Sequence, residues 1–139
     1  MPATSLAYAF LAHTELQTGN YLKAIEFLDF ASSINNNLNI PELGAYIKYV
    51  TATKYSVLNK TKEAIEETTR ALSIYEQIKD TTGIASLYKF IGILYLQSSD
   101  HEDLVNAKVY FAKALDIHNR LKDYSRVGSD LSLIGNSFV

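Results

Sequence analysis

Residues 12–31 read AHTELQTGNYLKAIEFLDFA, and this stretch decides the fold. Apolar residues before Gly19-Asn20 recur at the spacing of one helical face, and those after it do the same. Gly19-Asn20 breaks the pattern between them. Ala12, Ala24 and Ala31 are small where two paired helices would come closest. The stretch therefore predicts a helical hairpin with alanines at the contact.

The same small residues return along the chain as columns, at intervals of 40 and then 43 residues. The three extra residues of the third repeat fall between Gly92 and Ala107, and we expect the turn around Ser98–His101 to absorb them. The columns are Ala12, Ala52, Gly92 and Gly135; Ala24, Ala64 and Ala107; Ala31, Ala71 and Ala114; Ile34, Ile74 and Ile117; and Leu38, Ile78 and Leu121.

Helix ends are predicted from turn-forming residues between the repeats. Pro41 suits the first turn of a helix, and Asn59 suits a turn inside the second hairpin. Asn35-Asn36-Asn37 is expected to cap the second helix, because asparagine tolerates the left-handed conformation. Ser99 and Glu102 have the spacing of a capping box for the sixth helix.

Composition excludes several classes of protein. The 139 residues carry a net charge of −2, without the basic excess typical of nucleic-acid binders. The apolar runs Leu6–Ala12 and Phe90–Leu96 are too short to cross a bilayer, and no basic residue precedes the first, so no signal peptide is visible. Cysteine is absent, and no Gly-rich phosphate loop or nucleophile elbow occurs. We therefore expect no enzyme, no cofactor and no metal.

The repeat resembles the tetratricopeptide repeat family. Gly19-Asn20-Tyr21-Leu22-Lys23-Ala24, followed by Leu28 and Ala31, is similar to the family's Gly-x-Tyr-x-x-Ala pattern, and Tyr88, Ile91-Gly92 and Tyr95 are similar to its first-helix positions. The period of 40 exceeds the usual value of about 34. Lys48 and Thr51 depart from apolar family positions, and the usual helix-ending proline is missing.

Longer-period variants occur in kinesin light chains, Leu-Gly-Asn-repeat adaptors, bacterial peptide-sensing regulators and tetratricopeptide-bearing sensor kinases. The segment Ala71–Asp80 looks most like the bacterial signalling set. The resemblance implies an all-α, right-handed α-solenoid of about 3.5 repeats and seven helices, in a single domain over 1–139. The expected repeats are 4–40, 41–80, 81–123 and a partial 124–139.

In this family the first helices line a concave groove. The resemblance places the groove on Leu6, Ala9, His13, Gln17, Tyr46, Tyr49, Thr53, Val57, Ser86, Lys89, Ile93, Gln97, Ser129, Ser132 and Asn136. Ala9 and His13 stand where a clamp for a C-terminal carboxylate needs Lys and Asn, so a chaperone-tail receptor is not predicted.

The candidate ligand-binding residues from that set are His13, Tyr46, Tyr49, Thr53, Lys89, Ile93 and Asn136. Tyrosine offers a large contact area, few rotatable bonds and a polar tip, so Tyr46 and Tyr49 suit contact with a peptide. The alternative is that both tyrosines only pack against the neighbouring repeat.

Other polar clusters receive structural interpretations. His101-Glu102-Asp103 lacks the His pair at i, i+4 of a helical zinc site, and its acids suit a helix start. His118 near the end of the sixth helix is expected to be structural or solvated. Lys62–Arg70 reads as a solvated face on which Glu66 and Arg70 can pair.

The last residues predict the first helix of an incomplete repeat. Leu131, Ile134 and Phe138 are expected to stack on the third repeat, while Leu133 and Val139 add apolar surface. Such an edge suggests an excised fragment of a longer array or a homodimer through this helix.

The sequence thus favours a protein- or peptide-binding module, such as the sensing or scaffolding region of a larger bacterial signalling protein like a sensor kinase. The alternatives are the peptide-pheromone receptor domain of a transcription regulator and a purely structural adaptor scaffold.

Overall fold

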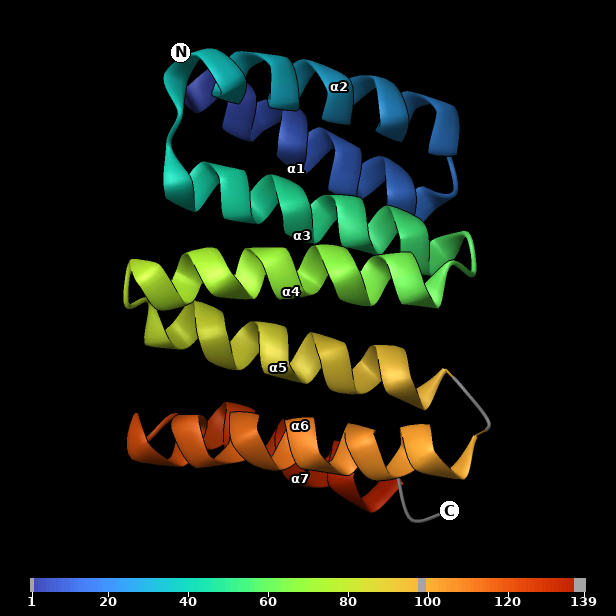
Figure 1. Ribbon diagram of the computed structural model, residues 1–139, viewed down its shortest axis with the longest axis vertical. Coiled ribbons are helices and arrows are strands. Elements are labelled where there is room, and N and C mark those ends of the chain that lie inside the picture. Colours follow the sequence, from blue (N-terminus) through green and yellow to red (C-terminus); the bar gives the residue numbers. More distant parts are fainter. Residues whose placement is uncertain (1, 98–99, 137–139) are drawn as a thin grey trace. The chain divides into compact units, whose positions relative to one another are not determined.

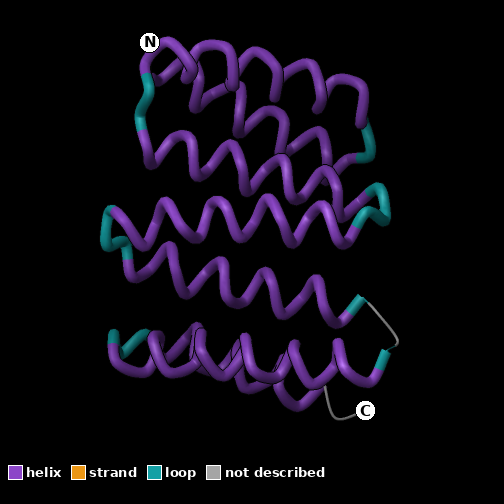
Figure 2. The backbone as a smooth tube through the Cα atoms, in the orientation of Figure 1, coloured by secondary structure: helices purple, strands orange, loops and turns teal. Residues whose placement is uncertain are grey.

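The structure, a computed structural model, describes residues 2–97 and 100–136. Seven helices follow one another: α1 (Pro2–Thr18), α2 (Tyr21–Leu38), α3 (Pro41–Val57), α4 (Thr61–Gln77), α5 (Thr81–Leu96), α6 (His101–Arg120) and α7 (Tyr124–Asn136). These described ranges contain no strand (Figure 2). The predicted all-α class with seven helices is confirmed. Within the same ranges no helix is both long and apolar enough to cross a membrane.

The helices belong to two compact units. The first unit, Met1–Ile78, holds α1 to α4, and the second, Lys79–Val139, holds α5 to α7. In the first unit α1 pairs with α2, α3 pairs with α4, and α3 also packs against α1 and α2 (Figure 1). In the second unit α5 pairs with α6, and α7 packs against α6. The first unit therefore has the side-by-side hairpins of a solenoid, as the repeat predicts.

Small residues lie where paired helices touch, as predicted. Ala12 and Ala52 are fully buried, and Gly92 is buried against Phe111. Gly135 is exposed instead, with nothing within 4 Å of the place a Cβ would occupy, because no second helix packs on α7 in the described chain. The alanines of the other two columns are all fully buried: Ala24, Ala64, Ala107, Ala31, Ala71 and Ala114.

Residues with left-handed backbone end the helices at repeat intervals. Asn39, Lys79 and Lys122 have φ values of 53°, 57° and 58°, and each lies between two consecutive repeats. Gly19 and Asn59, at 87° and 60°, play the same part inside the first two hairpins. A single left-handed residue reverses the chain after a helix and satisfies its last carbonyls.

The predicted cap at Asn35-Asn36-Asn37 is wrong, since these residues lie inside α2. The left-handed residue is Asn39, whose N–H donates to the carbonyl of Asn35 at 2.6 Å. The Asn35 side chain extends the cap, because its Oδ1 accepts from the N–H of Ile40 at 3.2 Å. Pro41 opens α3 as expected.

Most of the insertion in the third repeat lengthens α6. This helix has 20 residues, against 18 in α2 and 17 in α4. It begins six residues before Ala107, whereas α2 and α4 begin three residues before Ala24 and Ala64. The expectation of a longer turn alone is therefore wrong, and Ser98 and Ser99 lie outside the described residues.

The extra turn of α6 has its own stabilising residues. Asp100 is the N-cap, and its Oδ1 accepts from the N–H of Glu102 at 3.2 Å. Glu102 and Asp103 place negative charge in the first turn, where the helix dipole favours it. The predicted capping box required Ser99, which the structure does not describe.

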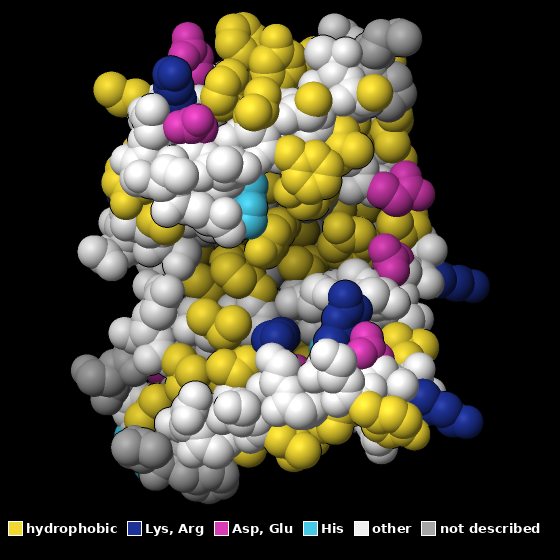
Figure 3. All heavy atoms as spheres, turned by 180° about the vertical axis from the view of Figure 1, so that it is seen from behind, with side chains coloured by type: hydrophobic (Ala, Val, Ile, Leu, Met, Phe, Trp, Pro, Cys, Tyr) yellow, Lys and Arg dark blue, Asp and Glu magenta, His cyan; other side chains and the backbone are white. Residues whose placement is uncertain are grey.

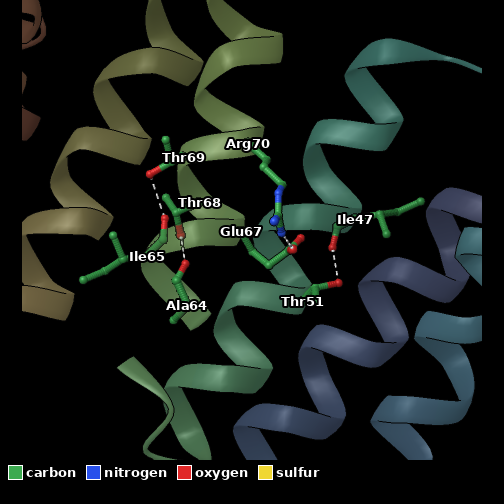
Figure 4. Close-up of polar contacts among 8 residues, drawn as sticks. All are labelled: Ile47, Thr51, Ala64, Ile65, Glu67, Thr68, Thr69 and Arg70. Atoms are coloured by element: carbon green, nitrogen blue, oxygen red, sulfur yellow. Dashed lines mark hydrogen bonds and ion pairs between the residues drawn. The ribbon is translucent and has the colours of Figure 1, made fainter. Parts of the chain in front are cut away.

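Threonine hydroxyls inside α3 and α4 bond to the backbone of their own helix. Thr51, Thr68 and Thr69 each donate to the carbonyl four residues earlier, at 2.7–2.8 Å (Figure 4). Thr68 is fully buried, so this bond satisfies a hydroxyl that has no access to water.

The predicted Glu66–Arg70 pair is wrong. Arg70 pairs with Glu67, three residues earlier on α4 (Figure 4). The Glu67 side chain is only 18% exposed while that of Arg70 is 58% exposed, so the guanidinium reaches a carboxylate at the edge of the buried face. Glu66 is exposed.

A buried polar pair holds α7 against α6. Nδ1 of His118 lies 2.5 Å from Oδ2 of Asp130, and the two side chains are 1% and 0% exposed. His118 is thus a structural residue, buried in the interior of the second unit. Beside this pair, Nζ of Lys89 donates to Oγ of Ser129 at 2.7 Å and joins α5 to α7.

The apolar residues of α7 contribute less than expected. Leu131 is 54% exposed, so the prediction that it stacks on the third repeat is wrong. Neighbouring residues of a helix are rotated by about 100° around its axis, so the inward side chain of Asp130 leaves Leu131 directed toward solvent. Ile134 and Leu133 are half-buried, while Phe138 and Val139 lie outside the described residues.

Candidate functional site

Four ring-bearing side chains of the first unit form a row. Phe10 and Tyr46 have ring centroids 5.2 Å apart, Tyr46 and Tyr49 6.1 Å, and Tyr49 and His13 5.9 Å. These distances suit tilted aromatic contacts. We call Phe10, His13, Tyr46 and Tyr49 the aromatic row.

The sequence places this row through two equal spacings. Phe10 and His13 lie three residues apart on α1, and Tyr46 and Tyr49 lie three apart on α3, so each pair shares a helix face. The two helices pack against each other, and the fully buried Ala9 next to Phe10 leaves room for a close approach. The rings of α1 and α3 therefore meet above an alanine-lined contact.

The aromatic row is accessible to a partner. Phe10 is 54% exposed, and the other three residues are half-buried. An apolar cavity of about 320 Å³ adjoins Tyr46, lined by Ala3, Leu6, Ile40, Glu42, Leu43 and Tyr46 itself. Figure 3 shows hydrophobic side chains gathered over the first unit, in the upper half of the view. Exposed rings next to an apolar cavity form a surface suited to apolar side chains.

Burial shifts the proton equilibria of the row. The pKa of Tyr46 rises to about 12, chiefly because burial disfavours the phenolate, with Tyr49 and Tyr75 adding repulsion. Burial also raises the pKa of Tyr49, against a hydrogen bond with Thr53 that lowers it. Burial lowers the pKa of His13 below its usual value. At neutral pH the row is therefore uncharged and suited to apolar contacts.

Thr53, also predicted for the site, follows the row along α3. Its Oγ1 donates to the carbonyl of Tyr49 at 3.1 Å, and its side chain is half-buried. Thr53 thus lies one turn from Tyr49 on the same helix, and its hydroxyl is satisfied by the backbone.

The other three predicted site residues belong to the second unit. Lys89 is half-buried and bonded to Ser129, Ile93 is half-buried on α5, and Asn136 is the exposed last residue of α7. Their grouping with the aromatic row in one groove stays a prediction.

Sequence reasoning missed Phe10 and misplaced Ala9. Ala9 is fully buried in the core, so it cannot line a groove. Phe10 has the same spacing to His13 as Tyr46 has to Tyr49, and this parallel was the available signal.

No group of three or more His, Cys, Asp or Glu side chains within residues 2–97 and 100–136 is arranged to hold a metal ion. In the predicted cluster, Glu102 and Asp103 stabilise the start of α6 as described above, and His101 is exposed.

Comparison with known proteins finds similarity among solved structures. No protein-family profile matches the chain, and no curated protein matches it. Among solved structures, the crystal structure of BtubC (BKLC) from P. vanneervenii is similar, with a TM-score of 0.82 and 26% sequence identity over 99% of this chain. The match covers 57% of that chain, so the present chain spans little more than half its length. The likeness supports the fold of paired helices.

Proposed function

We propose that the chain is a binding module that holds a peptide or an extended protein segment on the aromatic row. The observation that carries this proposal is the contiguous set of half-exposed rings from α1 and α3 beside an apolar cavity. Aromatic side chains with a polar tip contribute much binding energy for little loss of conformational freedom. The sequence contributes no catalytic motif, so the module binds without catalysing a reaction.

The resemblance to tetratricopeptide repeats supports the wider context that we propose. The chain would be the sensing or scaffolding region of a larger bacterial signalling protein, such as a repeat-bearing sensor kinase. A receptor domain for a peptide pheromone in a transcription regulator is the alternative binding role. In a purely structural adaptor, a segment of the parent protein would itself cover the aromatic row.

The test selects peptides from a phage-displayed random library on the 139-residue chain and measures their affinity by fluorescence anisotropy. The variant Phe10→Ser combined with Tyr46→Ser removes the exposed end of the aromatic row. We expect it to weaken the selected peptides by at least about thirtyfold, since truncating a central aromatic anchor costs about 2 kcal/mol or more.

The matched control is Leu22→Ser, which removes an apolar side chain that is 84% exposed on α2. It should bind the selected peptides as the unmodified chain does, and circular dichroism should give equal helicity for all three proteins. Peptides that bind the double variant with unchanged affinity would show that the aromatic row is not the binding surface.

A homodimer through α7 is a second prediction that rests on Leu131, which is 54% exposed on this helix. Light scattering should detect a dimer that Leu131→Ser dissociates. A monomer at all concentrations would contradict it.

A further inference from the structure

A second cavity, of about 340 Å³, lies in the first unit and is lined by no residue of the aromatic row. The end of α2, the start of α3 and the end of α4 meet there. Its volume lies within the range of sites that hold small ligands or a few residues of a peptide.

The lining of this cavity is rich in hydrogen-bond donors. Its polar side chains are those of Ser32, Asn35, Asn36, Asn39, Lys48 and Gln77, and no Asp or Glu lines it. Four carboxamides, a hydroxyl and an ammonium therefore face a space without any negative charge. We call this space the amide cavity.

Lys48 gives the amide cavity a positive charge that the described chain does not neutralise. The ion pairs found in residues 2–97 and 100–136 all involve other cations. The cavity also adjoins Pro41 at the start of α3, where the helix dipole is positive. Both contributions favour an anionic group.

Gly44 leaves space beside the donor atoms. The Oδ1 of Asn35 accepts from the N–H of Ile40, so the Nδ2 of that amide is directed to its other side. A Cβ at position 44 would lie 3.2 Å from this Nδ2, closer than side chains normally pack. Glycine inside a helix costs about 1 kcal/mol relative to alanine, and here its missing side chain keeps the Asn35 amide accessible from the cavity.

From these contacts we propose that the amide cavity binds a carboxylate of a peptide. Lys48 supplies the opposite charge, and the carboxamide N–H groups of Asn35 and Asn36 donate to the carboxylate oxygens. The carboxylate comes either from a C-terminus or from an Asp or Glu side chain, which offer the same two acceptor oxygens. This site is separate from the aromatic row and does not depend on it.

The test follows the side-chain amide signals of the asparagines by ¹H–¹⁵N NMR while peptides are added to the full chain. The probes are acetyl-triglycine with a free C-terminus, the same peptide amidated, and an amidated peptide of equal length with a central glutamate. The first or the third should shift the Asn35 and Asn36 signals with millimolar affinity, and their difference identifies the source of the carboxylate. The neutral amidated peptide should shift neither.

Two variants test the amide cavity: one removes its positive charge and the other adds a methyl group beside the Asn35 amide. Lys48→Met should weaken the carboxylate peptides about tenfold or more, and Gly44→Ala should weaken them while the fold is retained, because alanine favours the helix. Lys54→Met is the matched control, since Lys54 lies on the same helix over the ring of Tyr55 and does not line the cavity. It should bind as the unmodified chain does.

The proposal is overturned if the neutral peptide shifts the same signals equally, if no probe shifts them, or if Lys48→Met binds normally. The Phe10→Ser and Tyr46→Ser variant should bind the carboxylate probes unchanged. Loss of peptide binding at the aromatic row and loss at the amide cavity are therefore separate results.

Discussion

His118 and Asp130 connect α6 to α7 through one short contact inside the second unit, with Nδ1 and Oδ2 2.5 Å apart. The remaining polar atoms of this pair, Nε2 and Oδ1, are buried and have no hydrogen-bond partner in the described residues. Asp130 is also the only residue of described α7 that is fully buried. α7 is therefore attached through a buried polar contact, while Leu133 and Ile134 of the same helix are half-buried.

Removing Asp130 should destabilise the second unit strongly. Asp130→Ala leaves a buried imidazole without its partner, and breaking a buried pair in this way costs about 3–5 kcal/mol. Urea denaturation should show the loss, and hydrogen exchange should locate it in α7. Asp116→Ala, which breaks the exposed pair with Arg120, should cost less than about 1 kcal/mol. Equal effects of the two variants would contradict a special role for the buried pair.

Gly92 and Phe111 pack too closely for any side chain at position 92. A Cβ there would lie 2.5 Å from Cε1 and 2.7 Å from Cδ1 of the fully buried Phe111 ring. Gly92→Ala should therefore destabilise the α5–α6 hairpin by about 1–3 kcal/mol, despite the better helix propensity of alanine. Thermal unfolding followed by circular dichroism measures the change.

A matched glycine on α7 gives the opposite expectation. Gly128 has nothing within 4 Å of its would-be Cβ, so Gly128→Ala should stabilise the chain by up to about 1 kcal/mol. If both alanine variants were stabilising, the close packing of Gly92 on Phe111 would be refuted.

Tyr46 should ionise only at strongly alkaline pH. Its pKa of about 12 in the folded chain exceeds the value of about 10 for an exposed tyrosine. The folded state therefore retains this proton longer than the unfolded state does, and the stability that results is present below pH 10 and lost as the pH rises from about 10 to 12. Tyrosinate absorbs at 295 nm, so the absorbance of the unmodified chain is compared with that of Tyr46→Phe across a pH titration. The difference between the two curves should have its midpoint near pH 12. A midpoint near pH 10 would show that the ring is not buried.

The left-handed residues between repeats predict a stabilising substitution. Lys79 has a φ of 57°, a conformation that costs a non-glycine residue about 1 kcal/mol. Lys79→Gly removes this conformational cost. Lys60→Gly is the control: Lys60 has a φ of −99°, so glycine there increases the entropy of the unfolded chain by the same amount but removes no conformational cost from the folded chain. Urea denaturation should find Lys79→Gly more stable than Lys60→Gly by about 1 kcal/mol. The reverse order would contradict the backbone conformation at Lys79.

Much of the fold was predictable because helix pairs need small residues at regular intervals. Ala24, Ala64 and Ala107 showed the hairpins in the sequence, and all three are fully buried. Helix ends were predicted less well. A run of asparagines fits both the interior and the end of a helix, and only the repeat position of Asn39 distinguishes the residue that adopts the left-handed conformation.

The candidate site was predictable only in part. The resemblance to tetratricopeptide repeats singled out His13, Tyr46 and Tyr49 together, and the structure joins these three to Phe10. The pairing of His118 with Asp130 was not predictable, because it depends on the rotation of α7 about its axis. The sequence favoured Leu131 and Ile134 as the inward residues of α7, and the structure turns Asp130 inward while Leu131 is exposed.

Alanine columns occupy the contacts between paired helices, and exposed residues of α1 such as Phe10 and Leu11 lie outside the buried core of the first unit. We expect the exposed residues of α1 to be exchangeable with little effect on the hairpins, whereas most residues of α3 are buried or half-buried. Natural drift, or a designed library, can thus rewrite what this surface recognises while the scaffold beneath it stays unchanged.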